Sequence, residues 1–345
     1  MMRCPRFAYR APRTLAEAAA ILAGEGPEAM LLAGGTDLVP NMKRRQQTPR
    51  VVVSLRRIAT LREASPAGPA TRLGAMLTLS EVIGSEFSAG ARGALRKAAA
   101  QVATPHLQNM GTLGGNLCLD TRCNYYDQNL EWRSAIDFCM KKDGKVCWVA
   151  PGSPRCWAVT STDTAPALMA LGAEVVLHGA RGERTLPVGQ LYRDDGIAYL
   201  AKRADEILSG VLLPVAVPGE ASTYWKLRRR GAFDFPVLSV AAWVRKDADG
   251  VVREARLILG SVASRPLPAD ASSLVGNPLT EETIQSAAEA GARLAKPLDN
   301  TDFALGWRKK AAFSLIAGAL RELRGDDPEA LGPFARRAAA LVPAG

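Results

Sequence analysis

The chain has 345 residues, of which 48% are hydrophobic and 23% charged, as expected for a globular protein of about two or three domains. No apolar run reaches the roughly 18 residues that span a bilayer, and no apolar segment follows the basic start, so we expect no membrane helix and no secretory signal. The net charge is +10 (44 basic minus 34 acidic residues), but the basic residues are scattered, which argues against nucleic-acid binding. We therefore expect a cytoplasmic protein with reduced thiols.

The first hundred residues alternate between helical and strand patterns. Residues 14–24 predict a helix, because Thr14 precedes Glu17 in the spacing of a capping box. Continuous apolar segments predict buried strands over residues 29–33 and 51–55. Helical patterns return at 79–87 and 91–102.

Two glycine pairs, about 80 residues apart, each lie in a turn with a threonine and a polar residue. The first turn consists of Leu32, Ala33, Gly34, Gly35, Thr36, Asp37 and Leu38, and the second of Thr112, Leu113, Gly114, Gly115, Asn116 and Leu117. Either one alone is an ordinary turn motif. Together they predict two loops whose backbone amides hold one pyrophosphate of a dinucleotide.

Five of the six cysteines lie between residues 118 and 156, directly after the second turn. Cys123, Cys139, Cys147 and Cys156 have 15, 7 and 8 residues between them. Four thiolates suit an iron–sulfur cluster, and zinc or inert buried thiols are the alternatives. The spacing lacks the short C-x(2–4)-C pairs typical of zinc sites. Cys118 is treated as a spare thiol and Cys4 as a structural or exposed one.

The second half of the chain predicts further strands and then helices. Strands are expected over residues 173–178 and 206–213, with a linker over 214–219. Apolar segments at 237–245 and 251–259 flank Asp249-Gly250, which predicts a hairpin. Helices are expected over 281–294 and 303–323, and a short terminal helix over 328–342.

The two glycine turns resemble the FAD-binding signatures of the flavoprotein (medium) subunit of the xanthine dehydrogenase family of molybdenum hydroxylases. Residues 161–168 and 224–228 extend the resemblance, which covers the chain from Phe7 to about Leu323. It implies an α+β fold: a two-lobed FAD-binding domain of the vanillyl-alcohol-oxidase type, then a smaller C-terminal α+β domain of the CO dehydrogenase flavoprotein type. We expect lobe 1 over residues 1–55, lobe 2 over 56–218, the C-terminal domain over 219–325 and a helical tail over 326–345.

The resemblance also implies roles for single residues. Ala33 to Asp37 and Thr112 to Asn116 would hold the pyrophosphate, and Asp163 would lie near the ribityl or adenosine part of FAD. Lys226, Arg230 and Asp234 match a family pattern near the flavin ring, although each is also compatible with a solvated surface charge. His106, just before the second turn, is interpreted either as a flavin contact, even a covalent one, or as an ordinary hydrogen-bonded histidine.

The insert at about 119–158, which most members of the family lack, resembles that of 4-hydroxybenzoyl-CoA reductases, where four cysteines bind a [4Fe-4S] cluster. This implies an electron-relay subunit without catalytic residues of its own, supplied with electrons by ferredoxin. Its partners would be a large molybdenum-cofactor subunit and a small subunit with two [2Fe-2S] clusters, in a heterotrimer that dimerises. The alternatives are a CO-, aldehyde- or purine-type flavoprotein subunit that passes electrons to NAD or quinone, and a stand-alone metal-binding module.

Overall fold

The computed structural model describes residues 2–301, 303–327 and 330–331. Within this part the helices are α1 (Leu15–Glu25), α2 (Leu38–Lys43), α3 (Leu79–Gly84), α4 (Gly93–Ala100), α5 (Pro105–Gln108), α6 (Leu113–Leu117), α7 (Leu130–Ala135), α8 (Thr164–Ala170), α9 (Glu281–Leu294) and α10 (Leu305–Arg324). The strands are β1 (Ala8–Arg10), β2 (Ala29–Leu32), β3 (Val51–Ser54), β4 (Ala64–Ala67), β5 (Ala70–Gly74), β6 (Glu174–Gly179), β7 (Gly182–Pro187), β8 (Ile207–Pro214), β9 (Glu220–Leu227), β10 (Leu238–Lys246), β11 (Val252–Gly260) and β12 (Leu267–Ala269).

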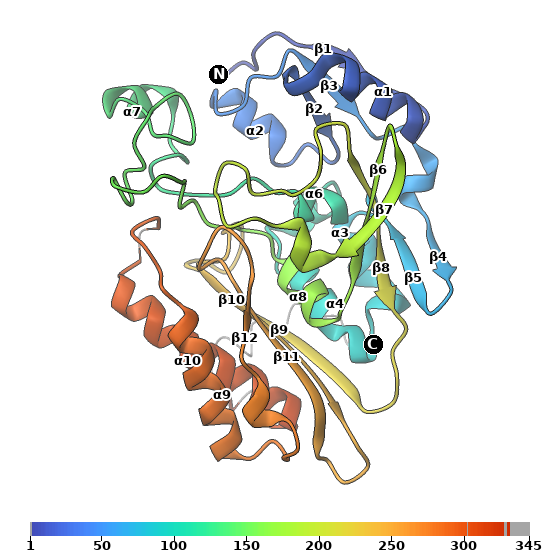
Figure 1. Cartoon of the computed structure of the whole chain (residues 1–345), viewed down its shortest axis with the longest axis vertical. Coiled ribbons are helices and arrows are strands. Elements are labelled where there is room, and N and C mark those ends of the chain that lie inside the picture. The colour runs from blue at the N-terminus through green and yellow to red at the C-terminus, as the bar shows by residue number, and fades with distance from the viewer. Residues whose placement is uncertain (1, 302, 328–329, 332–345) are drawn as a thin grey trace.

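These strands form three sheets, stacked along the long axis of the molecule (Figure 1). A parallel sheet in the order β1-β3-β2 forms the N-terminal lobe with α1 and α2. A five-stranded antiparallel sheet, β4-β5-β8-β6-β7, forms the middle lobe. The C-terminal domain has the antiparallel order β12-β11-β10-β9.

The C-terminal sheet is buried on both faces because its strands carry large apolar residues at alternating positions. Tyr224 and Trp243 pack into the core of the middle lobe, next to α4 and α8. Trp225 and Val240 point to the other face and pack against α9 and α10. The alternation follows from the two-residue period of a strand. The middle lobe and the C-terminal domain therefore share a continuous packing surface.

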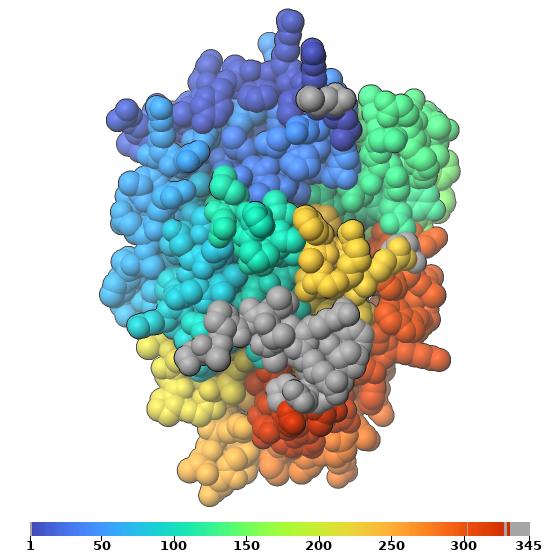
Figure 2. All heavy atoms as spheres, turned by 180° about the vertical axis from the view of Figure 1, so that it is seen from behind, coloured from blue at the N-terminus to red at the C-terminus, as the bar shows by residue number. Residues whose placement is uncertain are grey.

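The segment from residue 119 to 158 projects beside the N-terminal lobe and above the start of α10 (Figures 1 and 2). It contains little regular structure apart from α7. Backbone bonds hold it to the rest: the Asn124 amide donates to the Asn300 carbonyl at 3.0 Å, and Arg122 and Val159 exchange two bonds of 2.8 Å each. Side-chain bonds from Gln46 to the Tyr126 carbonyl and from Arg133 to the Arg44 carbonyl add to these, so the insert is held at several points although it belongs to no sheet.

Several predicted elements are confirmed almost to the residue. The Thr14 hydroxyl accepts a hydrogen bond from the Glu17 amide at 3.1 Å at the start of α1. Helix α9 has the predicted bounds, and the hairpin around Asp249-Gly250 joins β10 and β11. The hairpin β4–β5 was not predicted, because its first strand is largely exposed and carries no alternating apolar pattern. The expected terminal helix at 328–342 lies outside the described residues apart from 330 and 331.

None of the helices in the described part of the chain has the length and apolar character needed to cross a bilayer.

Substitution of Gly318 tests the packing of α10 on the C-terminal sheet. A Cβ at Gly318 would lie 2.4 Å from the Trp225 ring, so we expect Gly318→Ala to lower the free energy of unfolding by about 1–3 kcal/mol. Gly306 in the same helix has no atom within 4 Å of its Cβ position, so Gly306→Ala should leave that energy unchanged or raise it by up to about 1 kcal/mol. Urea unfolding of both variants measures the difference, and equal effects would contradict the packing argument.

Candidate functional site

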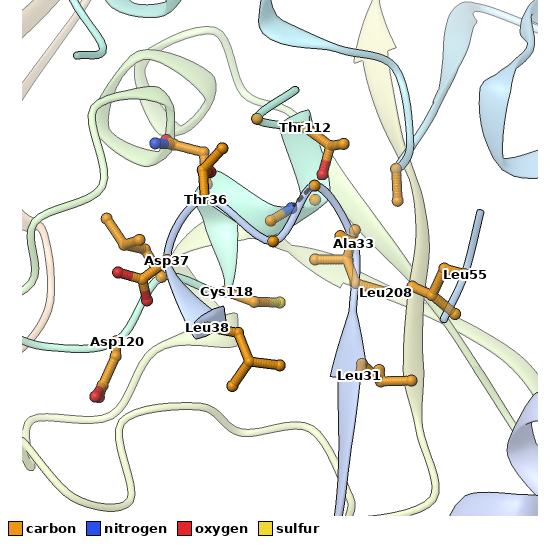
Figure 3. Close-up of a pocket in the computed structure, with 18 of the residues that line it drawn as sticks. Leu31, Ala33, Thr36, Asp37, Leu38, Leu55, Thr112, Cys118, Asp120 and Leu208 are labelled. Carbon is orange, nitrogen blue, oxygen red and sulfur yellow. Dashed lines mark hydrogen bonds between the residues drawn. The ribbon is translucent and has the colours of Figure 1, made fainter. Parts of the chain in front are cut away.

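A cavity of about 370 Å³ lies where the N-terminal lobe, the middle lobe and the loop after β9 meet (Figure 3). Its walls come from the turn after β2, the segments on both sides of α6, the loop before β8 and residues 233–235. Both predicted glycine turns are therefore brought to one cavity. The site residues among its lining are Ala33, Gly34, Gly35, Thr36, Asp37, Leu38, Thr112, Gly114, Gly115, Asn116 and Asp163.

The first glycine turn is pressed against the backbone of the segment before α6. A Cβ at Gly34 would lie 1.9 Å from the carbonyl oxygen of Met110, so no larger residue fits. Gly35 has φ of +77°, a left-handed conformation that favours glycine. Thr36 and Asp37 then line the cavity, whereas Leu32 lies outside the lining and packs with Leu38. The glycine pair thus permits a close backbone contact and a turn that side chains would prevent.

The second glycine turn begins α6 and rests on the middle lobe. The Thr112 hydroxyl accepts a hydrogen bond from the Gly115 amide at 3.0 Å, as an N-cap does (Figure 3). A Cβ at Gly114 would lie 2.7 Å from the Cβ of Ala75, and the position of a Cβ on Gly115 lies 3.7 Å from the Cβ of Ala33. The two turns are therefore in contact with each other, and both line the cavity.

Asn116 fixes the start of α8 below the second turn. Its amide oxygen accepts hydrogen bonds from the Thr162 hydroxyl at 2.9 Å, the Thr164 amide at 3.0 Å and the Thr164 hydroxyl at 2.7 Å. Asp163 lies between these two threonines and lines the cavity. The residues that resemble a family motif at 161–168 are thus tied to the second glycine turn through one buried side chain.

Four aspartates line the cavity. Each forms an ion pair with a lysine or arginine that lies outside the lining. The pairs are Asp37 with Arg122, Asp120 with Lys141, Asp163 with Lys226, and Asp234 with Arg230. Lys202 is the only lysine or arginine among the described lining residues. The cavity surface therefore carries acceptors, and most of the balancing positive charge lies behind it.

The pair of Asp163 and Lys226 is the most deeply buried. The Lys226 ammonium donates to Asp163 at 3.0 Å and to the Gln101 carbonyl at 2.9 Å, and the Tyr224 hydroxyl donates to Asp163 at 2.6 Å. Burial raises the pKa of Asp163 and lowers the pKa of Lys226, while their mutual attraction opposes both shifts. Lys226 lies behind Asp163 and is not part of the lining, so it acts on the cavity through Asp163.

Two other predicted residues lie away from the cavity. His106 is exposed on α5, and its neighbour Leu107 lines the cavity in its place. A contact between His106 and a flavin stays a prediction. Arg230 is exposed and pairs with Asp234, where hydrogen bonds from Arg230 lower the pKa of the carboxyl against the effect of burial.

Several lining residues had no sequence signal strong enough to find them. For Cys118 and Asp120 the only clue in the sequence was their position directly after the second turn. Tyr199, Lys202 and Phe233 come from irregular loops without a motif, and only the tertiary fold brings them to the cavity.

The four insert cysteines surround a second, smaller space. Cys123, Cys139, Cys147 and Cys156 are buried, form no disulfide and line one cavity with residues that include Tyr126 and Lys141. That cavity measures only about 10 Å³, so a group of several atoms enters only if the surrounding loops move outward. Within the described residues, no group of three or more His, Cys, Asp or Glu side chains is arranged to hold a metal ion.

Backbone amides point at three of these sulfurs. The Ala158 amide donates a hydrogen bond to the Cys156 sulfur at 3.4 Å, and the amides of Tyr125 and Lys141 favour the thiolates of Cys123 and Cys139. Burial raises the pKa of Cys123 to about 12 and of Cys156 to about 11, and the amide bonds oppose this shift. Hydrogen bonds to sulfur are a feature of iron–sulfur sites, so the donor chemistry fits such a group.

Comparison with protein families gives two matches that together span most of the chain. Residues 5–216 match the FAD binding domain in molybdopterin dehydrogenase, and residues 222–323 match the CO dehydrogenase flavoprotein C-terminal domain. Both expected components of the fold are thereby confirmed, as is the expectation of an FAD-binding domain.

Individual relatives agree. The medium chain of carbon monoxide dehydrogenase from Hydrogenophaga pseudoflava is 28% identical, over 92% of this chain and 96% of its own. The FAD subunit of nicotinate dehydrogenase from Eubacterium barkeri is also 28% identical, over 81% and 83%. A solved structure of carbon monoxide dehydrogenase from Hydrogenophaga pseudoflava superposes with a TM-score of 0.76 at 27% identity, covering 93% of this chain and 98% of that one.

Replacement of Gly34 tests the contact between the two turns. We expect Gly34→Ala to weaken FAD binding by roughly five- to 150-fold, because the new Cβ must displace the Met110 carbonyl and strain of this kind costs about 1–3 kcal/mol. Gly84→Ala is the control, since no atom lies within 4 Å of its Cβ position. Flavin titration followed by fluorescence measures both. Unchanged affinity in Gly34→Ala would show that this contact does not shape the site.

Proposed function

Because the chain belongs to the family of FAD-binding domains of molybdopterin dehydrogenases, we propose that it is the FAD- and [4Fe-4S]-carrying electron-transfer subunit of a molybdenum-containing 4-hydroxybenzoyl-CoA reductase. The complex would reduce 4-hydroxybenzoyl-CoA with two electrons and two protons to benzoyl-CoA and water. The substrate would bind to another subunit, and this chain would relay electrons from ferredoxin.

One observation carries the proposal: four buried cysteines, none in a disulfide, line a single space beside the FAD cavity. Separate stretches of the insert supply them, with no regular sheet to bring them together. Reduced buried thiols of this number suit a bound iron–sulfur group better than inert packing, because backbone amides are already directed at three of the sulfurs. Cys123, Cys139, Cys147 and Cys156 would be the ligands.

The chain's own residues would position both cofactors. When bound, the cluster supplies one-electron transfer and the flavin exchanges one or two electrons. The two glycine turns would hold the pyrophosphate, since their backbones approach the cavity without side chains in the way. Asp163, kept in place by Tyr224 and Lys226, would accept hydrogen bonds from the ribityl or adenosine hydroxyls. The cysteine loops must open outward to admit a four-iron cluster.

A second candidate is a flavoprotein subunit of a different molybdenum hydroxylase, one that passes electrons to NAD or quinone. The relatives support it directly, because they are named as subunits of carbon monoxide, nicotinate and aldehyde oxidoreductases. The two candidates differ in the direction of electron flow. Reduction of the flavin by ferredoxin favours the first, and reoxidation of the flavin by NAD favours the second. The family match disfavours a stand-alone metal-binding module.

The partners follow from the proposal. Carbon monoxide dehydrogenase relatives are described as medium chains, and we propose a heterotrimer with a large molybdenum-cofactor subunit and a small subunit carrying two [2Fe-2S] clusters, dimerised as a whole. Two exposed apolar side chains are available for such contacts: Phe233, which lines the cavity, and Met110, which precedes the lining residue Gly111. A reduced cluster and a ferredoxin donor place the complex in the cytoplasm in this proposal.

Metal and flavin analysis of anaerobically purified protein tests the cluster. We expect about four irons and four sulfides per FAD, since four cysteines ligate one [4Fe-4S] cluster. Cys139→Ser should lose most of the iron and keep the flavin, whereas Cys4→Ser should keep both, because Cys4 packs in a separate apolar cluster. Bound zinc, or flavin without iron, would contradict the proposal.

Salt dependence tests the ferredoxin step. The net charge of +10 should attract an acidic ferredoxin, so the second-order rate of flavin reduction should fall steeply between low salt and 0.15 M, where the screening length is about 8 Å. Stopped-flow absorbance measures the rate, with a small uncharged reductant as the control. A rate independent of salt would remove the electrostatic docking step.

A further inference from the structure

Lys141 is held rigidly at the wall of the cysteine cavity. Its ammonium donates to the Asp120 carboxylate at 2.8 Å, the Thr121 hydroxyl at 2.8 Å and the Gly196 carbonyl at 2.6 Å, which uses all three of its protons. It also lies over the Tyr126 ring, 4.8 Å from the centroid. The side chain is 6% exposed and lines the cavity together with the four cysteines. Its charge is therefore fixed in place and shielded from solvent.

Asp120 lies at the other end of the same ion pair and lines the FAD cavity. One of its oxygens accepts from Lys141, and the other accepts from the Tyr126 hydroxyl at 2.9 Å and from the Gln47 amide at 3.3 Å. Figure 3 shows its side chain on the same side of the cavity as Asp37. The ion pair thus spans the wall between the two cavities, with its positive end at the cysteines and its negative end at the FAD site.

The buried Lys141–Asp120 ion pair is not well explained by a contribution to folding stability alone. Burying two charges costs free energy that their attraction repays only in part, and apolar residues of similar volume are often as stabilising. The positive end lies beside the sulfurs: Lys141 follows Cys139 by two residues and lines the small cavity together with all four cysteines. Charge near an iron–sulfur group or a flavin is one of the main determinants of its reduction potential.

We propose that the Lys141–Asp120 ion pair sets the difference between the reduction potentials of the two cofactors. This rests on the proposed function, which places a cluster at the cysteines and FAD in the larger cavity. The ammonium stabilises the more negative, reduced cluster and raises its potential. The carboxylate disfavours added negative charge on the flavin and lowers its potential. The pair therefore raises the potential of the cluster relative to that of the flavin, which shifts the equilibrium of electron transfer between the two cofactors.

Opposite substitutions separate this role from a structural one. In Lys141→Met the unpaired carboxylate remains, so the cluster potential should fall enough to change the equilibrium constant of its one-electron reduction at least tenfold, about 59 mV. In Asp120→Asn the unpaired ammonium remains, so the cluster and flavin potentials should both rise. The double variant should lie between the single ones. Potentiometric titration followed by EPR for the cluster and absorbance for the flavin measures each value.

Two control variants test whether the effect depends on the charge at Lys141. One keeps that charge, and the other removes an exposed charge elsewhere in the insert. Lys141→Arg retains the positive charge and should keep the cluster potential close to that of the wild type. Lys145→Met removes an exposed charge from the same insert and should have little effect, because solvent screens it. Shifts of the same sign in Lys141→Met and Asp120→Asn, or lower cofactor content with unchanged potentials, would overturn the inference and leave the pair a structural link.

The flavin half of the test does not need the cluster. In a Cys123→Ser background, Asp120→Asn should still raise the flavin potential, because the lost carboxylate lines the FAD cavity. An unchanged flavin potential there would refute that half. Wild-type protein that holds flavin but no iron would overturn the proposed function and the cluster half together. Full iron content with unmoved potentials would overturn the inference alone.

Discussion

The contact of backbone on backbone between the two glycine turns is the constraint on which the site depends. At Gly34 there is room for a hydrogen atom and nothing larger beside the Met110 carbonyl, and at Gly114 the chain rests on Ala75. The first contact joins the N-terminal lobe to the middle lobe without an interposed side chain, and the second seats α6 within the middle lobe. The proposed FAD cavity lies beside these contacts and is lined by both turns, by the loop before β8 and by residues 233–235. Side chains then decide its chemistry.

The location of the cysteine insert follows from the same constraint. The chain leaves α6 at Leu117 and enters the insert within a few residues, so its first polar side chains still face the FAD cavity while the next ones face the cysteines. Asp120 and Lys141 meet across that boundary, and Arg122 reaches back to Asp37 in the first turn. An insertion at this point of the fold is thereby tied to the first glycine turn by an ion pair, with no sheet to support it.

Local patterns in the sequence predicted what local forces determine. The capped start of α1, the bounds of α9 and the Asp249-Gly250 hairpin depend on residues within a few positions of each other. The glycine turns were found because two ordinary turn motifs occurred together. The remote parts of the site were not: Tyr199 and Phe233 reach the cavity from irregular loops. Lys226 was predicted only through the resemblance to the family, and it lies one layer behind the cavity. Such placements depend on how sheets pack, which no short window of sequence encodes.

The arrangement of charge explains how one cavity can serve an anionic dinucleotide while carrying carboxylates. Each lining aspartate has its cation outside the lining, so the pairs present acceptors to the interior and remain close to neutral as units. A pyrophosphate is repelled by such acceptors, so we expect it at the glycine turns, where Gly34, Gly35, Gly114 and Gly115 line the cavity without side chains. Hydroxyl groups and ring N–H donors belong beside the aspartates. The carboxylate ends of the ion pairs, which face the cavity, would thus orient FAD. At Asp120 the other end of the pair, the Lys141 ammonium, lines the cysteine cavity.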